Sequence, residues 1–211
     1  MNNKTLLFCL PAILGVPLFG AHASGKETPE DDGEKTGRPN VLFLLTDDQT
    51  FNTIRALGNT EIHTPNMDRL VRRGVAFTQT HVMGGLNGAV SQPSRAMLLT
   101  GRGLMDVHRN GGFIPQAEKT FPEVFRENGY TTFATGKWHS DNASFNRSFS
   151  TGANIFFGGM HPYGRNNELG HRRPYLHQYD PAGDYNDRNG AWADASPETF
   201  SSKLYADAAI G

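Results

Sequence analysis

The fold of this protein is decided by one stretch, Ser91-Gln92-Pro93-Ser94-Arg95-Ala96-Met97-Leu98-Leu99-Thr100-Gly101-Arg102. Pro93 sets the backbone for a first helical turn, and residues 96–99 continue as good helix formers. On such a helix Ser91 and Arg95 share a face, one turn apart. The positive helix end then carries a hydroxyl beside a guanidinium, which suits a tetrahedral oxyanion. The spacing alone modestly favours a plainer interpretation, an ordinary Ser-Pro-Ser helix start with a solvated arginine.

A carboxylate pair follows the first apolar run of the domain. Residues 41–45 (Val-Leu-Phe-Leu-Leu) are apolar without alternation, which is typical of a strand buried on both faces in a parallel sheet. Asp47 and Asp48 come directly after it, at the edge where open α/β sheets place their sites. The pair could cap the next helix, or it could bind a hard divalent cation that neutralises two adjacent like charges.

A second strand end carries an ammonium group and an imidazole. Residues 130–135 (Tyr-Thr-Thr-Phe-Ala-Thr) are predicted to form a strand that ends in Gly136-Lys137-Trp138-His139. In extended backbone Lys137 and His139 point to one side and Trp138 to the other. A lone Lys-x-His pair is usually a surface feature, but after a glycine at the catalytic edge of a sheet it is suited to binding an anion.

Capped helices alternate with these strands. A helix over 65–73 begins after Thr64, and a strand over 75–80 follows it; the expected buried stripe of this helix is Met67, Leu70 and Val71. The capping box Thr120-x-x-Glu123 opens another helix, and residues 200–210 begin a further one. The alternation predicts an α/β fold with a mainly parallel central sheet flanked by helices.

The segment between the last predicted strand and the last helix is loop-like and rich in aromatic residues. Residues 158–167 and 171–175 combine Tyr, His, Arg and Asn side chains. These side chains suit sugar hydroxyls and sulfates, so the segment could line a substrate groove. An ordinary irregular excursion accounts for it equally well.

The N-terminus indicates export. Residues 1–23 are predicted to be a secretory signal peptide, with Lys4 before an apolar core and Ala21-His22-Ala23 as the cleavage pattern. The apolar run is short and contains two prolines, so no membrane anchor is expected. Residues 24–38 are charged and are predicted to be a flexible linker, with the domain over 39–211. The expected location is secreted, or periplasmic in a bacterium.

Charge and cysteine content exclude some function classes. Lysine and arginine together number 20 against 21 acidic residues, so bulk charge gives no indication of nucleic-acid or membrane-surface binding. The only cysteine is Cys9, which would leave with the signal peptide. The nucleophile of the mature chain is therefore expected to be a hydroxyl or a group made from one.

Taken as a string, the opening stretch resembles the signature of the type I sulfatases. That signature is (C/S)-x-P-S-R followed by a Leu-Thr-Gly-Arg segment, and this chain has its serine form, Ser91-x-Pro93-Ser94-Arg95 with Leu99-Thr100-Gly101-Arg102. The Asp47-Asp48 pair and the Gly136-Lys137-Trp138-His139 element are similar to family elements as well. The resemblance covers residues 39–211 and implies the N-terminal part of an alkaline-phosphatase-like catalytic domain, truncated in this chain.

The resemblance also implies a mechanism. In type I sulfatases the signature Ser or Cys is oxidised to formylglycine (3-oxoalanine), whose hydrate attacks the sulfur of a sulfate ester. Ser91 is then the modified and catalytic residue. By the same resemblance Arg95, Lys137 and His139 serve both catalysis and sulfate binding.

Cofactor and partners follow from the same resemblance. It implies a divalent cation, Ca²⁺ or alternatively Mg²⁺, held by Asp47, Asp48 and Ser91. Because the first motif position is serine, it implies maturation by a bacterial radical maturase. The expected activity is sulfuric ester hydrolysis, on a sulfated carbohydrate or another sulfate ester.

Two other functions remain open on the sequence. One is a phosphomonoester or phosphonate hydrolase that uses unmodified Ser91. The other is an inactive, truncated, sulfatase-like fragment that binds sulfated glycans. The family's downstream metal ligands, second His and second Lys have no match in this chain, so the 211 residues alone are expected to lack sulfatase activity.

Overall fold

The computed structural model describes residues 8–9, 38–86, 90–159, 175–186, 189–192 and 201–211. The predicted signal peptide and linker therefore lie almost wholly outside the described residues, as do the aromatic segments over 160–174. The chain divides into two compact units, Met1–Val82 and Met83–Gly211. No helix among the described residues has the length and apolar character that crossing a bilayer requires.

The first unit is built from short elements. They are β1 (Phe8–Cys9), β2 (Phe43–Leu44), the 3₁₀ helices η1 (Phe51–Thr53) and η2 (Arg55–Leu57), and α1 (Pro65–Arg73). β1 pairs antiparallel with β2. Ile54, between the two 3₁₀ helices, is fully buried.

Two predicted strands of this unit were wrong in this structure. The run over 41–45 forms only the two residues of β2, with Val41 50% and Leu42 60% exposed. No strand forms over 75–80, where Val75 and Phe77 are each 66% exposed. An apolar run is buried on both faces only where strands flank it and helices cover it. Among the described residues β1 is the sole strand paired with β2.

The helix predicted over 65–73 is confirmed as α1, but its anchor is polar. Thr64 is the N-cap, and its hydroxyl donates a hydrogen bond to Asp68 Oδ1 at 2.8 Å. The same oxygen accepts from the Ala56 N–H at 2.9 Å, and Asp68 is only 5% exposed. A buried carboxylate that accepts two hydrogen bonds therefore connects α1 to η2. The apolar face of α1 that was expected to be buried is only half-buried; its residues are Met67, Leu70 and Val71.

Asp68→Asn is expected to remove the acid sensitivity of the first unit. Burial acts to raise the pKa of Asp68, but the two hydrogen bonds, with Arg72 and Arg55 nearby, hold that pKa below its usual 3.8. Because the folded-state pKa is depressed, the carboxylate stabilises the fold above the unfolded-state pKa, and this stabilisation is lost as the pH falls through the folded-state pKa. Hydrogen-exchange protection of the Ala56 amide should therefore decline in acid in the parent protein.

In the Asp68→Asn variant the amide oxygen can still accept both hydrogen bonds, so the fold is retained without the titrating charge. Protection of the Ala56 amide should then be lower than in the parent at neutral pH and nearly constant below it. An unchanged decline in acid in this variant would show that another group governs the pH dependence.

The second unit contains a four-stranded mixed sheet. Its strands are β3 (Phe133–Lys137), β4 (Thr151–Phe156), β5 (Tyr175–His177) and β6 (Gly190–Trp192), in that order across the sheet. β3 and β4 are parallel, and the other two pairings are antiparallel. The strand predicted over 130–135 thus begins three residues later and continues to Lys137.

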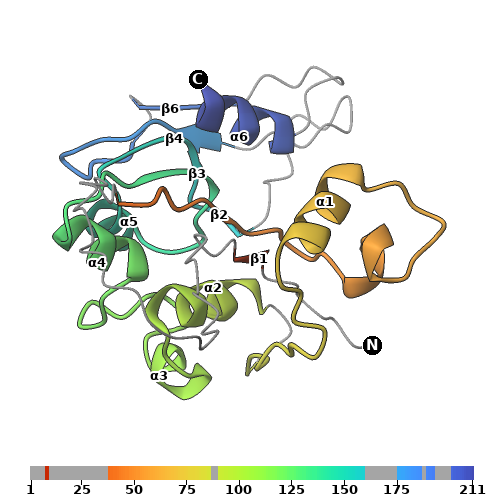
Figure 1. Ribbon diagram of the computed structural model, residues 1–211. Helices are drawn as coiled ribbons and strands as arrows, with labels where there is room; N and C mark the ends of the chain where they lie inside the picture. Colours follow the sequence, from red (N-terminus) through yellow and green to blue (C-terminus); the bar gives the residue numbers. More distant parts are fainter. Residues whose placement is uncertain (1–7, 10–37, 87–89, 160–174, 187–188, 193–200) are drawn as a thin grey trace, which may run out of the picture. The chain divides into compact units, whose positions relative to one another are not determined.

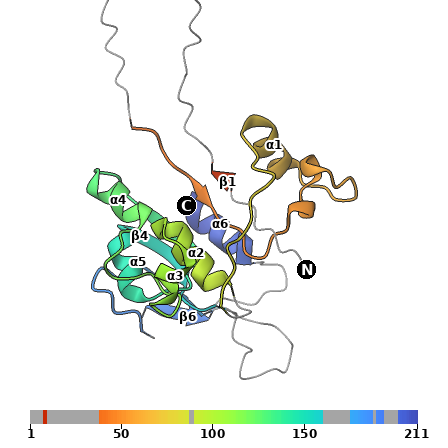
Figure 2. The same ribbon diagram turned by 90° about the horizontal axis from the view of Figure 1, so that it is seen from below.

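Helices flank this sheet on both sides. They are α2 (Ser91–Thr100), α3 (Leu104–His108), α4 (Phe121–Glu127), α5 (Asn142–Ser148) and α6 (Ser201–Ile210). Within this unit, α6 covers one side of the β3–β4 pair, and α2 and α3 lie on the other (Figures 1 and 2). The α/β class is thereby confirmed. The sheet of this unit is mixed where a mainly parallel one was expected, because only β3 and β4 pair in parallel and the next two pairings are antiparallel.

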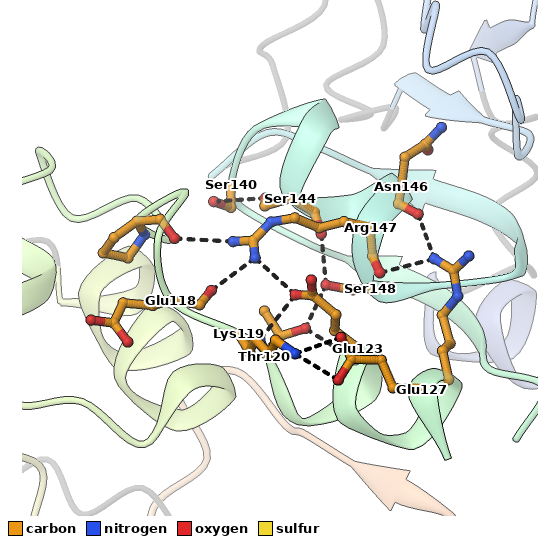
Figure 3. Close-up of polar contacts among 12 residues, drawn as sticks. Glu118, Lys119, Thr120, Glu123, Glu127, Ser140, Ser144, Asn146, Arg147 and Ser148 are labelled. Carbon is orange, nitrogen blue, oxygen red and sulfur yellow. Dashed lines mark hydrogen bonds and ion pairs between the residues drawn. The ribbon is translucent and has the colours of Figure 1, made fainter. Parts of the chain in front are cut away.

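An apolar core and a polar frame hold the second unit together. The core gathers around Phe145, which is 1% exposed. Beside it, the capping box of α4 forms as predicted, because Thr120 and Glu123 each bond the other's backbone N–H. Arg147 of α5 donates to Glu123 Oε2 and to the Glu118 carbonyl, each at 2.8 Å, as Figure 3 shows. These contacts fix α5 against α4, directly after the turn that contains the predicted Lys-His pair.

Candidate active site

Ser91 and Arg95 lie on α2, as the sequence predicts. Ser91 is the first residue of this helix, and the Ser94 N–H makes its opening bond to the Val90 carbonyl at 3.0 Å. The side chains of Ser91 and Arg95 are both partly exposed, whereas Pro93 between them is buried. The helix ends at Gly101, whose left-handed backbone (φ 68°) suits a glycine cap. A hydroxyl thus stands at the positive end of a regular ten-residue helix.

Arg95 joins this helix to the end of β3. Its Nη1 donates a hydrogen bond to the Lys137 carbonyl at 2.6 Å, across 42 positions of sequence. A charged donor makes such a bond stronger than a neutral one, particularly when it is partly buried. Two of the predicted site residues are therefore brought together, with the guanidinium of Arg95 at the backbone from which the Lys137 side chain extends.

The turn after β3 is held by Trp138. Its backbone N–H donates to the Phe156 carbonyl at 2.8 Å, and its indole N–H lies 3.1 Å from the Asp141 carbonyl and 3.2 Å from Ser144 Oγ. Trp138 is 5% exposed, while Lys137 and His139 on either side are only partly buried. This pattern of burial agrees with the prediction that Trp138 points to the opposite side from Lys137 and His139. The indole anchors the turn and leaves its two neighbours nearer the surface.

His139 has a constrained position. Its backbone is left-handed (φ 58°), a conformation that is uncommon for a residue with a side chain. Its ring lies against Gly159, three residues beyond the end of β4. The extended geometry expected for Lys137-Trp138-His139 therefore does not persist to its last residue, because β3 ends at Lys137 and the chain turns at His139.

Tyr205 of α6 adds a residue that the sequence did not indicate. Its ring packs on Gly136, where an added Cβ would lie 3.3 Å from the ring carbon Cδ2. Burial raises the pKa of the Tyr205 phenol, and the nearby Arg95 guanidinium acts in the opposite direction. Its buried hydroxyl makes no hydrogen bond to any residue that the structure describes. A phenol therefore lies close to Arg95 beside the end of β3.

The predicted metal ligands Asp47 and Asp48 belong to the first unit. Both are exposed, and Asp48 has a left-handed backbone (φ 56°). Adjacent carboxylates are the hard oxygen donors that Ca²⁺ and Mg²⁺ prefer, so the chemistry of the pair fits such an ion. Within the described ranges no group of three or more His, Cys, Asp or Glu side chains is placed to hold a metal. The pair thus fits as two of the six to eight oxygen ligands that Ca²⁺ takes.

Two glycines of this site make contacts that the sequence did not predict. Gly136 lies inside β3, one residue before its end, and Gly159 lies three residues beyond its parallel neighbour β4. Each glycine has a ring packed on its backbone: Tyr205 on the first and His139 on the second. A glycine after a strand is a weak signal by itself, because most such residues simply open a turn. Only the parallel pairing of β3 with β4 shows that Gly136 and Gly159 lie toward the same edge of the sheet.

Comparison with known proteins gives one consistent result. The family model described as Sulfatase matches residues 39–199. An N-acetylglucosamine-6-O-sulfatase of Bacteroides thetaiotaomicron is 36% identical over 135 residues, which is 61% of this chain and 22% of that protein. Arylsulfatase G of Mus musculus is 31% identical over 204 residues, 89% of this chain and 36% of that protein. No solved structure matches significantly.

Proposed function

Since this chain belongs to the sulfatase family, we propose that it contributes an active site for the hydrolysis of sulfate esters. The observation that carries the proposal is the bond from Arg95 to the Lys137 carbonyl. It joins the helix that begins at Ser91 to the strand end that carries Lys137 and His139. A hydroxyl-derived nucleophile, two cations and an imidazole are groups that can promote the transfer of a sulfuryl group.

Ser91 is the proposed nucleophile in its formylglycine form, which when hydrated supplies a hydroxyl that can attack sulfur and a second one that can expel sulfate. The side chains of Arg95 and Lys137 bind the sulfate oxygens and balance the charge that grows on them. His139 holds or moves a proton at its imidazole. The N-terminus of α2 directs its N–H groups toward the same anion.

Asp47 and Asp48 are proposed to bind a divalent cation together with Ser91, Ca²⁺ being the first candidate and Mg²⁺ the second. Carboxylate oxygens suit both ions, and a bound cation would supply a positive charge beside the sulfate. The exposed positions of both carboxylates are compatible with this role, since an ion can reach them.

The proposed substrate class is sulfated carbohydrate. Support comes from the two relatives of Bacteroides thetaiotaomicron, named N-acetylglucosamine-6-O-sulfatase and N-acetylgalactosamine-6-O-sulfatase. The chain spans only 22% and 27% of the lengths of these two relatives. A radical maturase acting on Ser91, and a secreted or periplasmic location, complete the proposal.

Two measurements on the full-length protein test it. Mass spectrometry of the peptide that contains Ser91, after coexpression with a radical maturase, should show the loss of two hydrogens. The same preparation should hydrolyse an aryl sulfate faster than the matching aryl phosphate. An unmodified Ser91 with preferential phosphate ester hydrolysis would instead favour a phosphomonoester hydrolase. Binding of a sulfated glycan without turnover of either ester would favour an inactive glycan-binding protein.

A further inference from the structure

The ring of His139 occupies space that only a glycine at position 159 leaves open. A Cβ built on Gly159 would lie 2.2 Å from His139 Nε2, 2.6 Å from Cε1 and 3.1 Å from Cδ2. Carbon and nitrogen atoms that are not bonded normally stay beyond about 3.4 Å, so the smallest side chain would collide with the outer edge of the imidazole. That edge carries Nε2, one of the two atoms through which histidine exchanges protons.

The sheet register explains why these two residues meet. Lys137 pairs with Phe156 in the parallel β3–β4 ladder, and the Trp138 N–H extends the pairing to the Phe156 carbonyl. The segments that leave the two strands therefore run beside each other, with His139 two residues past one strand end and Gly159 three past the other.

The turn cannot easily yield to such a collision. On one side of His139, Trp138 is held in the core by its two indole hydrogen bonds and by edge contacts with the rings of Phe145 and Phe149. On the other side, Ser140 is 8% exposed, and its hydroxyl accepts from the Ile114 N–H at 3.2 Å. With both neighbours held, the backbone of His139 cannot shift away from a clash at Gly159, so the part of His139 that can move is its ring.

We propose that Gly159 is a positioning residue, which sets the orientation of the His139 imidazole by having no side chain. This inference rests on the role proposed above for His139, and it adds a residue outside the sequence motifs. The backbone of Gly159 is not in the left-handed region, so alanine fits its conformation. The requirement for glycine here is therefore for space beside the imidazole and not for a special backbone angle.

Gly159→Ala in the full-length protein tests this inference. The chain has eight histidines, so the His139 imidazole signal in a ¹H–¹³C NMR spectrum is assigned as the one lost in His139→Ala. We expect Gly159→Ala to shift that signal and its titration midpoint. With an aryl sulfate, kcat should fall by about tenfold or more with a smaller change in KM, because Arg95 and Lys137 still bind the sulfate when the His139 ring is displaced.

Two further variants keep the test decisive. Gly103→Ala is the matched control, since its added Cβ would meet only Asp106 Oδ2, at 3.8 Å, and it should leave both readouts unchanged. The double variant His139→Ala/Gly159→Ala removes the collision. It should be no less active than His139→Ala alone, and it should restore any thermal stability lost in Gly159→Ala.

An unshifted His139 signal in Gly159→Ala would overturn the inference, as would additive losses of activity in the double variant. A shifted signal with unchanged kcat would support positioning by Gly159 and contradict the catalytic role proposed for His139. The two proposals therefore fail in distinguishable ways.

Discussion

Replacing Ser91 with alanine is expected to abolish sulfate ester hydrolysis. The variant lacks the only atom from which the proposed nucleophile can be made, and losing a nucleophile typically lowers kcat by about 10³-fold or more. The helix should persist, because alanine is the best helix former and the Ser94–Val90 backbone bond does not involve the Ser91 side chain. Turnover of an aryl sulfate by the full-length protein, beside a circular dichroism spectrum, measures both effects.

Ser91→Thr sharpens this prediction. Threonine keeps a hydroxyl at the same place, but its oxidation would give a ketone in place of an aldehyde. Loss of activity in both variants supports a nucleophile made by oxidation, whereas activity retained in Ser91→Thr would indicate an unmodified hydroxyl. Ser202→Ala, on the exposed face of α6, is the control and should behave as the parent protein does.

The helices α2 and α4 were predictable because their sequence signals are local. A proline in the first turn and a glycine after the last residue mark α2, and a Thr-x-x-Glu box marks α4. The expected side change between Lys137 and Trp138 follows from alternation at the end of a strand, and Trp138 is the buried one of the two. Each of these features depends on residues within about one helical turn or one strand, so sequence spacing is sufficient to find it.

The contacts between these elements were not predictable in the same way. The Arg95–Lys137 bond joins residues 42 positions apart, and the packing of Tyr205 on Gly136 joins residues even more distant. Both depend on which strands pair and which side of the sheet a helix covers. Val41 was predicted to be buried and is exposed. Burial of an apolar run depends on neighbouring elements that the run itself does not specify.

Contacts between elements also indicate where a substitution should destabilise the second unit most. Phe145 is 1% exposed, and its ring meets Trp138 at 5.4 Å and Phe149 at 4.9 Å between centroids. It also packs over Gly152 of β4, where an added Cβ would lie 3.1 Å from its Cζ. One side chain therefore connects α5, the sheet and the turn that holds His139.

Phe145→Ala is expected to lower the free energy of unfolding of this unit by about 3–5 kcal/mol, the range for phenylalanine truncated in a packed core. Both tryptophans lie in the second unit, at positions 138 and 192, so their fluorescence during urea unfolding reports on this unit. Phe113→Ala removes the same atoms from a side chain that is 42% exposed, and it should cost less than about 1 kcal/mol. Equal losses in the two variants would show that Phe145 does not hold the core. A large loss confined to Phe145→Ala would show that this aromatic cluster stabilises the unit that carries Lys137 and His139.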